Sequence, residues 1–238
     1  MVFEMARISI LLYHHISQNV SEGLTVSTEN LEKQFRWISQ KGYQTHHFSE
    51  LITSQKYPKG KSVIITFDDG YVSQWQWAYP LLKKYHLKAT FFIPMKYIGG
   101  EDEWNRARQS IMTVEQLKSL DPAVIELGYH SYGHINYQEV SPEVAKTDLK
   151  QAITVAREST LPMQPLLAYP YGKFPRENSE REVFEGLLKM CGIQYAFRIG
   201  NKVSTFPFKN PYEIKRLDIK GEFSFERFKR KVKYGQLF

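Results

Sequence analysis

The chain has a single cysteine, no long hydrophobic run and no repeated segment. Cys191 is the one cysteine among 238 residues, which excludes an internal disulfide and a metal site built from several thiolates. No apolar stretch reaches the roughly 20 residues that a membrane-spanning helix requires. The proportions of hydrophobic (42%) and charged (24%) residues are ordinary, so the sequence predicts one globular domain over residues 1–238 and no transmembrane segment.

The N-terminal residues lack the pattern of a secretory signal peptide. Residues 1–16 hold only a short apolar run that leads directly into Tyr13-His14-His15. The charged segment, long apolar segment and small-residue cleavage site of a leader do not appear in order. We therefore expect a cytoplasmic protein. A chain whose leader had been removed would look the same, and would then be extracytoplasmic.

The net charge is +7, and part of it lies in residues 227–233 near the C-terminus. Phe225, Phe228 and Val232 recur at helical spacing, which predicts an amphipathic terminal helix with a basic outer face. A solvated surface explains such a face, and a contact with nucleic acid or an anionic surface is the alternative. The base-stacking motifs of RNA-binding modules are absent, so we predict no nucleic-acid partner.

Two adjacent carboxylates at the end of an apolar run are the first sign of chemistry. Residues 63–66 are typical of a buried strand, and Asp68 and Asp69 follow just before Gly70. Neighbouring strand residues point to opposite faces, so we expect a turn at Gly70 that directs both acids to one place. Burial of unpaired carboxylates is costly, which indicates a cation or a shared proton. An isolated pair of this kind would more often be a helix N-cap beside a solvated neighbour.

Two histidines further along the chain complete the pattern. His130 and His134 follow the apolar residues 124–128, and a helical turn would place them on one face, close enough to share a metal ion. A lone histidine there would more often be structural. Together with the aspartate pair, the two histidines predict a His-His-Asp site for a divalent cation, zinc by preference and cobalt or nickel as alternatives.

These motifs resemble those of the NodB-like polysaccharide deacetylases, carbohydrate esterase family 4. Residues 66–70 match the first family motif and residues 130–134 match the second. Residues 168–172 match the third, except that Ala168 stands where an arginine is usual. The resemblance covers residues 10–219. It implies a metal-dependent N-deacetylase acting on N-acetylated sugars or polysaccharide.

The resemblance also implies a role for each matching residue. Asp69, His130 and His134 would bind the metal, and Asp68 would be the general base that deprotonates the attacking water. The backbone N–H of Tyr171 would stabilise the developing oxyanion.

Three residues are predicted to contact the glycan substrate. Trp104 lies in the long segment 94–111, which has little periodicity and is of the kind that is often functional. Its ring can stack on a sugar, although an aromatic side chain in a loop more often fills a local gap. Tyr169 and Pro170 belong to the third motif.

One departure from the family pattern concerns the general acid. Residues 217–220 occupy the place where a late histidine is usual, and no histidine follows His134. A subgroup similar to the poly-N-acetylglucosamine deacetylases of biofilms carries the late strand at the start of the chain, with a signature like Tyr13-His14. We therefore predict that His14 is the general acid, with His15 as the alternative. The competing explanation is a packed histidine at a strand end.

A second departure concerns the arginine that is missing at Ala168. In the family this arginine holds the catalytic carboxylate in place. Arg216 and Lys220 lie near the end of a late strand, so they are the candidates to replace it.

Strand-like and helix-like segments alternate along the chain. About eight apolar strand candidates, from residues 8–12 to residues 213–217, alternate with amphipathic segments that start at cap signals such as Ser27, Thr113 and Ser141. A short strand is predicted over residues 43–48 and a helix over residues 73–85. The alternation is typical of an α/β barrel, and the resemblance implies a single-domain distorted (β/α)7-type barrel. The predicted catalytic and metal-binding residues all fall at strand ends.

Two other functions are compatible with the sequence. Relatives with the same fold hydrolyse small amides or cyclic imides. Ala168 and the absent late histidine also fit a catalytically inactive homologue that only binds carbohydrate.

Overall fold

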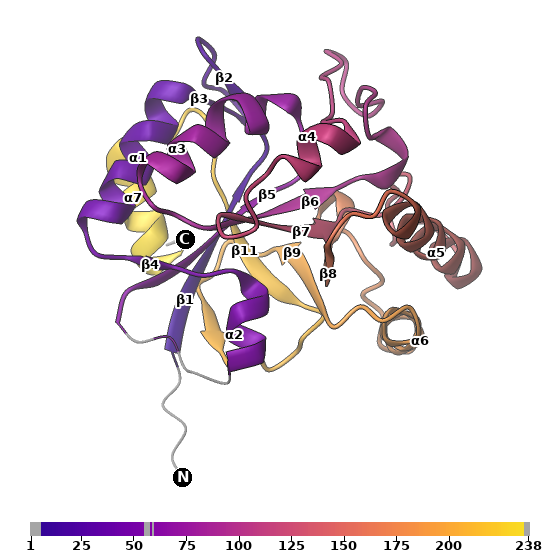
Figure 1. Cartoon of the computed structure of the whole chain (residues 1–238). Coiled ribbons are helices and arrows are strands. Elements are labelled where there is room, and N and C mark those ends of the chain that lie inside the picture. The colour runs from indigo at the N-terminus through magenta and orange to yellow at the C-terminus, as the bar shows by residue number, and fades with distance from the viewer. Residues whose placement is uncertain (1–5, 55–57, 59, 236–238) are drawn as a thin grey trace.

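The computed structural model describes residues 6–54, 58 and 60–235, which form one α/β barrel (Figure 1). Residues 1–5, part of the stretch searched for a signal peptide, lie outside the described residues. Seven parallel strands close the barrel in the order β1-β11-β9-β8-β7-β6-β5, and β5 pairs back with β1. They are β1 (Ala6–Tyr13), β5 (Ser62–Phe67), β6 (Ala89–Ile93), β7 (Ile125–Tyr129), β8 (Met163–Ala168), β9 (Tyr195–Ile199) and β11 (Ile214–Asp218). The predicted single-domain (β/α)7-type barrel is confirmed.

Short strands and seven α-helices surround this barrel in the described chain. They are β2 (His15–Ser17) paired with β3 (Thr25–Ser27), β4 (Gln44–Thr45) beside β5, and β10 (Ser204–Phe206) antiparallel to β1. The helices are α1 (Thr28–Gln40), α2 (Phe48–Ser54), α3 (Tyr79–Lys84), α4 (Val114–Lys118), α5 (Pro142–Glu158), α6 (Asn178–Met190) and α7 (Phe225–Tyr234). Figure 1 shows α1, α3 and α7 on one side of the barrel and α5 and α6 on the other, with α2 near the end where β1 begins.

Alternation along the strands separates an inner core from an outer one. Ile8 and Ile10 of β1 and Ile64 of β5 belong to one buried cluster, to which strands around the whole barrel contribute. Their neighbours Leu11 and Val63 belong to the larger cluster that includes side chains of the helices. Because successive strand residues point to opposite faces, the first cluster fills the barrel and the second lies between barrel and helices.

The predicted helix starts are confirmed. Ser27 caps α1 and Ser141 caps α5, each accepting a hydrogen bond from a backbone N–H three residues on. Thr113 and Gln116 form a capping box at the start of α4.

Two predicted elements differ in the structure. Residues 73–85 do not form one α-helix, because the segment begins as a π-helical turn, Gln74–Ala78, that continues into α3. Such turns are frequent at functional sites, and this one carries the buried Gln74 towards the ends of β1 and β5. The strand predicted over residues 43–48 is reduced to β4, because Phe48 already begins α2.

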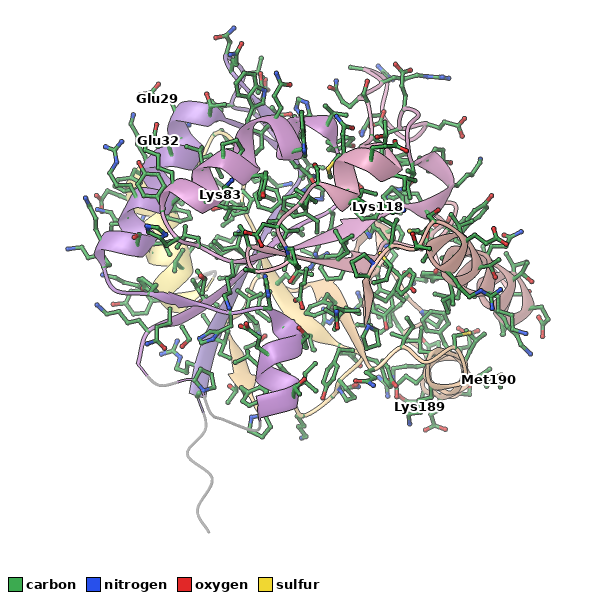
Figure 2. All side chains as sticks on the ribbon, in the orientation of Figure 1. Glu29, Glu32, Lys83, Lys118, Lys189 and Met190 are labelled. Atoms are coloured by element: carbon green, nitrogen blue, oxygen red, sulfur yellow. The ribbon has the colours of Figure 1, made fainter. Side chains whose placement is uncertain are left out.

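Charged side chains cover the outer faces of the helices. Figure 2 shows Glu29 of α1, Lys118 of α4 and Lys189 of α6 directed away from the barrel. Among the helices of the described residues, none is both long and apolar enough to span a lipid bilayer.

Candidate metal centre and active site

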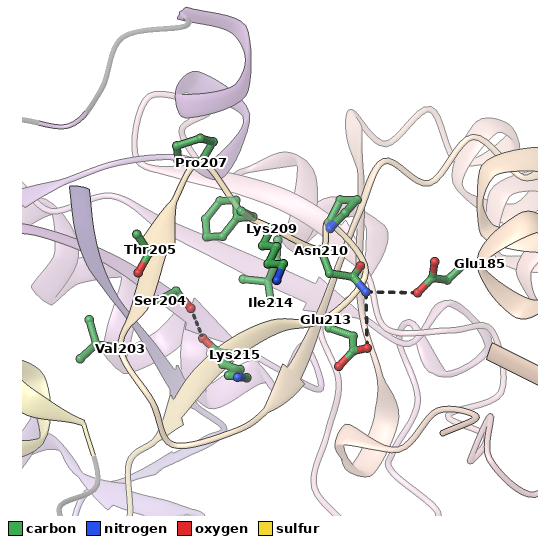
Figure 3. A pocket seen from close by; sticks show the side chains of 12 residues that line it. Glu185, Val203, Ser204, Thr205, Pro207, Lys209, Asn210, Glu213, Ile214 and Lys215 are labelled. Atoms are coloured by element: carbon green, nitrogen blue, oxygen red, sulfur yellow. Dashed lines mark hydrogen bonds between the residues drawn. The ribbon is translucent and has the colours of Figure 1, made fainter. Parts of the chain in front are cut away.

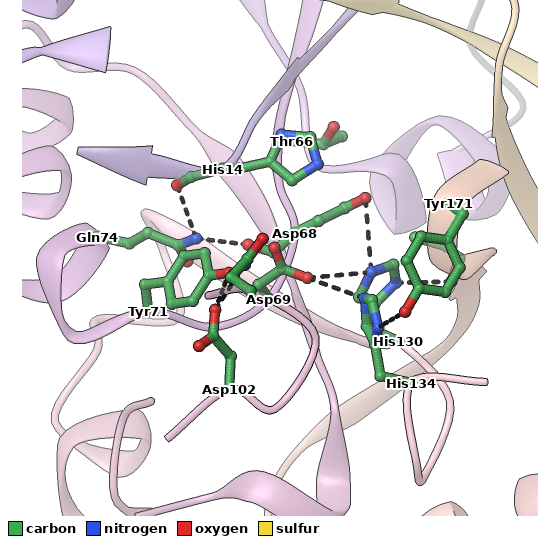
Figure 4. A network of polar contacts seen from close by, with 12 residues as sticks. His14, Thr66, Asp68, Asp69, Tyr71, Gln74, Asp102, His130, His134 and Tyr171 are labelled. Carbon is green, nitrogen blue, oxygen red and sulfur yellow. Dashed lines mark hydrogen bonds and ion pairs between the residues drawn. The ribbon is translucent and has the colours of Figure 1, made fainter. Parts of the chain in front are cut away.

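Asp68 and Asp69 follow β5 at the end of the barrel where the parallel strands finish. Asp68 continues the inward-facing row that includes Thr66. Asp69 has a left-handed backbone with φ of 75°, and Gly70 follows with φ of 63°, so the chain turns and both acids face one centre (Figure 4). A Cβ at Gly70 would lie 3.0 Å from the Ile93 side chain, which favours glycine on grounds of space as well as φ. The turn predicted at Gly70 therefore starts one residue earlier.

His130 and His134 lie on a turn after β7 that Asp148 of α5 holds in place. The carboxylate of Asp148 accepts hydrogen bonds from the backbone N–H groups of Tyr132 (2.9 Å) and Gly133 (2.8 Å). The turn is not helical as the i, i+4 spacing had suggested, since His134 has a left-handed φ of 54°. The two imidazoles still meet, with ring centroids 4.9 Å apart.

Asp69, His130 and His134 bring three potential ligand atoms together (Figure 4). Oδ1 of Asp69 lies 3.3 Å from Nε2 of each histidine, and all three residues are buried. Two ligands bound to zinc at about 2.1 Å in a tetrahedron would lie roughly 3.4 Å apart. The spacing of this group therefore suits one small cation.

The protonation of His130 supports the same interpretation. Its Nδ1 lies 2.8 Å from the carbonyl oxygen of Ala168, and a carbonyl only accepts, so Nδ1 carries the proton. In the neutral ring, Nε2 then presents a lone pair towards Asp69. Oδ1 of Asp69 is buried and has no hydrogen-bond partner among the described residues. Without a cation, the lone pair on Nε2 of His130 faces the lone pairs on Oδ1 of Asp69, and the two repel. A cation bound by Asp69, His130 and His134 would remove this repulsion.

The charges at the centre favour ionised carboxylates. Burial raises the pKa of Asp69, but the imidazoles of His130 and His134, each 3.3 Å from Oδ1, outweigh it and hold that pKa well below its usual range. Burial lowers the pKa of His130, but the charges of Asp68 and Asp69 outweigh it and raise that pKa. Burial lowers the pKa of His134. Such an anionic centre suits a divalent cation.

A buried arginine holds Asp68 with both of its terminal nitrogens. Nη1 and Nη2 of Arg216 on β11 each donate to one carboxylate oxygen of Asp68 at 2.6 Å, and the two residues are 0% and 2% exposed. Burial raises the pKa of Asp68, but the charges of Arg216 and His130 outweigh it, so this pKa lies below its usual value. Bidentate pairing of this kind fixes orientation as well as charge.

Arg216 replaces the arginine that is missing at position 168. Ala168 of β8 belongs to the core inside the barrel, and Arg216 lies over the ring of Phe92 in the same core. The prediction for Arg216 is confirmed. Lys220, the other candidate, instead pairs with Asp218 at 2.9 Å.

His14 emerges where the late family motif was expected. Strands β1 and β11 are neighbours, and the N–H of Ile219 donates to the carbonyl of Leu12 at 3.0 Å. Nε2 of Gln74 donates to the carbonyls of His14 (3.0 Å) and Asp68 (2.5 Å), which ties the ends of β1 and β5 together (Figure 4). Nδ1 of His14 is buried and has no hydrogen-bond partner among the described residues.

Two aromatic side chains flank His134. Trp104 stacks on the imidazole with ring centroids 3.7 Å apart, and the hydroxyl of Tyr171 lies 3.2 Å from Nδ1. Tyr171 is 50% exposed and has a left-handed φ of 58°. Trp104 is thus at the site, with one ring face against His134.

Tyr169 and Pro170 are both buried. Tyr169 stacks on Phe174 with centroids 4.8 Å apart, and its hydroxyl donates to the carbonyl of Tyr212. Neither residue therefore offers an exposed side chain, whereas the same turn leaves Tyr171 at the surface, and their contact with substrate stays a prediction.

A buried carboxylate ties the loop between β6 and α4 to the site. Asp102 is 0% exposed and accepts hydrogen bonds from the Tyr71 hydroxyl (2.8 Å), Asn105 Nδ2 (2.6 Å) and the N–H of Gln109 (2.9 Å). A cavity of about 260 Å³ lies between this loop, His14 and Asp69. Asp102 and Tyr71 are not predicted from the sequence, because nothing in their local sequence singles them out.

Replacing Asp102 with alanine is expected to loosen this loop. The Tyr71 hydroxyl and the Gln109 N–H would lose their acceptor, which lowers the free energy of unfolding by roughly 1–3 kcal/mol. Urea denaturation and limited proteolysis measure the effect, and new cleavage is expected within residues 101–110. Glu101→Ala alters the exposed acidic residue on the other side of Asp102 and should leave both unchanged. Identical proteolysis of the Asp102 variant and the native protein would contradict this role.

Three comparisons relate the chain to known proteins. A sequence model of the family described as polysaccharide deacetylase matches residues 55–187. YxkH of Bacillus subtilis (strain 168), whose name assigns it to the polysaccharide deacetylases, is 32% identical over 175 residues, 72% of this chain and 59% of YxkH. The poly-beta-1,6-N-acetyl-D-glucosamine N-deacetylase of Staphylococcus aureus (strain MSSA476) is 25% identical over 215 residues, 87% of this chain and 71% of that protein. The chain thus spans only part of these relatives.

A solved structure has the same fold. The Streptococcus pyogenes deacetylase PplD, in complex with acetate, superposes with a TM-score of 0.78, covers 96% of this chain and 99% of its own, and is 20% identical. At 20% sequence identity, this similarity shows that the two proteins share the barrel fold.

Proposed function

The chain belongs to the polysaccharide deacetylase family, and on that premise we propose that it is a metal-dependent N-deacetylase that removes acetyl groups from N-acetylated glycans. The observation that carries this proposal is the buried group of Asp69, His130 and His134 beside a second carboxylate, Asp68, that Arg216 holds in place.

Asp69, His130 and His134 are proposed to hold a divalent cation, zinc by preference and cobalt or nickel as alternatives. The cation supplies Lewis-acid activation of water and of the amide carbonyl. The hydrogen bonds of both Nδ1 atoms, to Ala168 and Tyr171, would fix the ring orientations before the cation binds.

Asp68 is proposed to be the general base. Arg216 keeps its carboxylate ionised and aimed at the centre, ready to accept a proton from the attacking water. The same pairing makes the Asp68 carboxylate a weaker base. It also fixes the orientation of that carboxylate, so the side chain does not have to reorient during the reaction.

His14 is proposed to donate a proton to the departing amine nitrogen. This role is supported by its place at the end of β1 and by the buried Nδ1 that lacks a partner among the described residues. The backbone N–H of Tyr171 is proposed to stabilise the oxyanion. The left-handed conformation of Tyr171 is of the kind that persists where function requires it.

The cavity beside His14 is the proposed place of the sugar that carries the amine. It lies on the His14 side of Asp69, where the leaving nitrogen must be to receive a proton. Asn105 and Gln109 line it and offer amide groups suited to sugar hydroxyls. The Staphylococcus aureus relative acts on poly-beta-1,6-N-acetyl-D-glucosamine, and an N-acetylated glycan is the substrate class proposed here.

One of the two reasons for considering an inactive, carbohydrate-binding homologue no longer holds. It rested partly on the missing arginine at Ala168, and Arg216 now makes the expected contact with Asp68 from another strand.

Acetate release from N-acetylglucosamine oligomers tests the proposal. Protein stripped of metal is expected to release no acetate, and added zinc, cobalt or nickel is expected to restore release. A cyclic imide serves as the comparison substrate. Hydrolysis of the imide without acetate release from any oligomer would replace the proposed activity by small-amide hydrolysis.

A further inference from the structure

A basic groove of about 590 Å³ lies between the end of α1 and α7. Five cations and one carboxylate line it, together with three aromatic rings. The charged residues are Lys41, Lys61, Glu226, Lys229, Arg230 and Lys233. The basic face predicted for the terminal helix is therefore one wall of a concave surface.

This groove is remote from the metal centre. Lys61 lies just before β5, and Tyr43 lies just before β4. Both therefore belong to the end of the barrel where the parallel strands begin, whereas Asp68 and His130 lie where the strands finish. Changes in the groove can be made without touching the proposed active site.

The positive charges of the groove are largely unbalanced. Glu226 pairs with Lys229, and within the described chain none of the other four cations forms an ion pair with a carboxylate. Nζ of Lys61 donates to the backbone carbonyl of Lys41 at 3.3 Å, so both residues contribute to the same stretch of the lining. Crowded like charges repel one another, and a bound anion would relieve that repulsion.

Aromatic rings form part of the lining. Trp37 and Tyr43 lie with ring centroids 5.3 Å apart, and Trp37 also packs against Phe228 of α7 at 5.8 Å, which fixes the two walls relative to each other. Nζ of Lys61 lies 5.9 Å from the Tyr43 ring. These ring contacts make the walls of the groove firm, and it is the cationic side chains on them that would follow the backbone of a linear polyanion.

A second, larger groove provides a contrast. It measures about 810 Å³ beside β10, and Figure 3 shows lysines and glutamates on its lining. Lys209 and Lys215 are balanced there by Glu185 and Glu213, and Asn210 bonds to both acids (Figure 3). Among these two grooves, only the one between α1 and α7 has a marked excess of one charge.

We propose that the groove between α1 and α7 binds a linear, phosphate-bearing polyanion other than a nucleic acid, since the chain lacks base-stacking motifs. Its cations stand on two walls, and Arg230 and Lys233 lie about one helical turn apart on α7. A threadlike chain can enter the concavity and contact both walls, whereas a flat bilayer would touch only the rims. Binding here would hold the enzyme on a polyanionic matrix and raise its local concentration near a glycan in the same matrix.

Binding of long-chain inorganic polyphosphate, measured by fluorescence anisotropy at several salt concentrations, tests this proposal. The triple variant Lys41→Glu, Lys61→Glu, Arg230→Glu is expected to bind roughly tenfold more weakly or worse, with a slope of log affinity against log salt that is smaller by roughly 2. The matched control changes Lys118, Lys150 and Lys189 to glutamate on α4, α5 and α6, and should bind nearly as the native protein does.

Equal loss of binding in both triple variants would overturn the proposal, because it would reduce the effect to net charge. Binding of the native protein to phosphatidylglycerol vesicles but not to polyphosphate would overturn it in favour of a membrane. Acetate release from a neutral oligomer should be the same in all three proteins, so failure here is distinguishable from failure of the proposed enzyme activity.

Discussion

Replacing Asp68 with asparagine is expected to lower kcat for acetate release by about 100- to 10,000-fold, the range typical of lost general-base catalysis. Asparagine keeps the size of the side chain and cannot accept the proton of the attacking water. Because Asp68 is not among the proposed ligands, metal binding should persist. Metal content after dialysis and kcat with saturating metal are the two measurements.

The adjacent carboxylate is the matched control. Asp69→Asn removes a proposed ligand, so it should lose both metal and activity. The two substituted positions are adjacent in the chain. Bound metal distinguishes the two roles, because only loss of a ligand should release the metal. Loss of metal from the Asp68 variant would count against its assignment as the base.

The second large effect is expected at Arg216. Replacement by methionine would leave the carboxylate of Asp68 buried without its partner, since both side chains are almost fully buried. Removing one partner of such a pair costs about 3–5 kcal/mol of stability. Urea denaturation at neutral pH measures this loss, and kcat should also fall because Asp68 is no longer held in place.

Two further variants separate the pair from the packing. In the double variant Asp68→Asn, Arg216→Met no unpaired charge is left, so much of the stability should return. In Arg216→Ala, Ala168→Arg the guanidinium would come from β8, as in the usual family motif, and activity should recover in part relative to Arg216→Ala. A single Arg216→Met variant as stable as the native protein would contradict the role of the pair.

The pH dependence of this stability loss has a definite sign. Arg216 holds the pKa of Asp68 in the native protein below its unfolded value, so the stability that it contributes is present above the unfolded pKa of about 3.9 and is lost as pH falls through the lowered native pKa. In Arg216→Met, the guanidinium no longer opposes the effect of burial, so the pKa of Asp68 is expected to be higher than in the native protein. The difference in stability between the two proteins should therefore narrow as the solution is acidified from neutral pH.

The barrel and the grouping of the proposed metal ligands could be predicted from the sequence because their signals are local. Apolar runs predict the strands, and strands of one parallel barrel finish at the same end, so residues just after them are brought together. The side chains of Asp68, Asp69, His130 and His134 all follow this rule. The backbone conformation that brings these side chains together could not be predicted, in particular the left-handed conformations of Asp69 and His134.

The supporting residues were hidden because their partners are distant in sequence or belong to the backbone. Asp148 holds the histidine turn through two backbone N–H groups, yet in sequence it is an ordinary residue of an amphipathic helix. Asp102 is tied to Tyr71 across 31 positions. Membership of a motif also does not tell which side chains face the core: Tyr169 is buried, whereas Tyr171 is half exposed.

Titration of metal into stripped protein, with acetate release recorded at each step, tests the central claim most directly. Release from an N-acetylglucosamine oligomer is expected to rise in proportion to added zinc and to level off at about one ion per chain, as one group of three ligands requires. Release by the stripped protein that added metal does not change, or no release at any ratio of any of the three metals, would contradict a metal-dependent deacetylase.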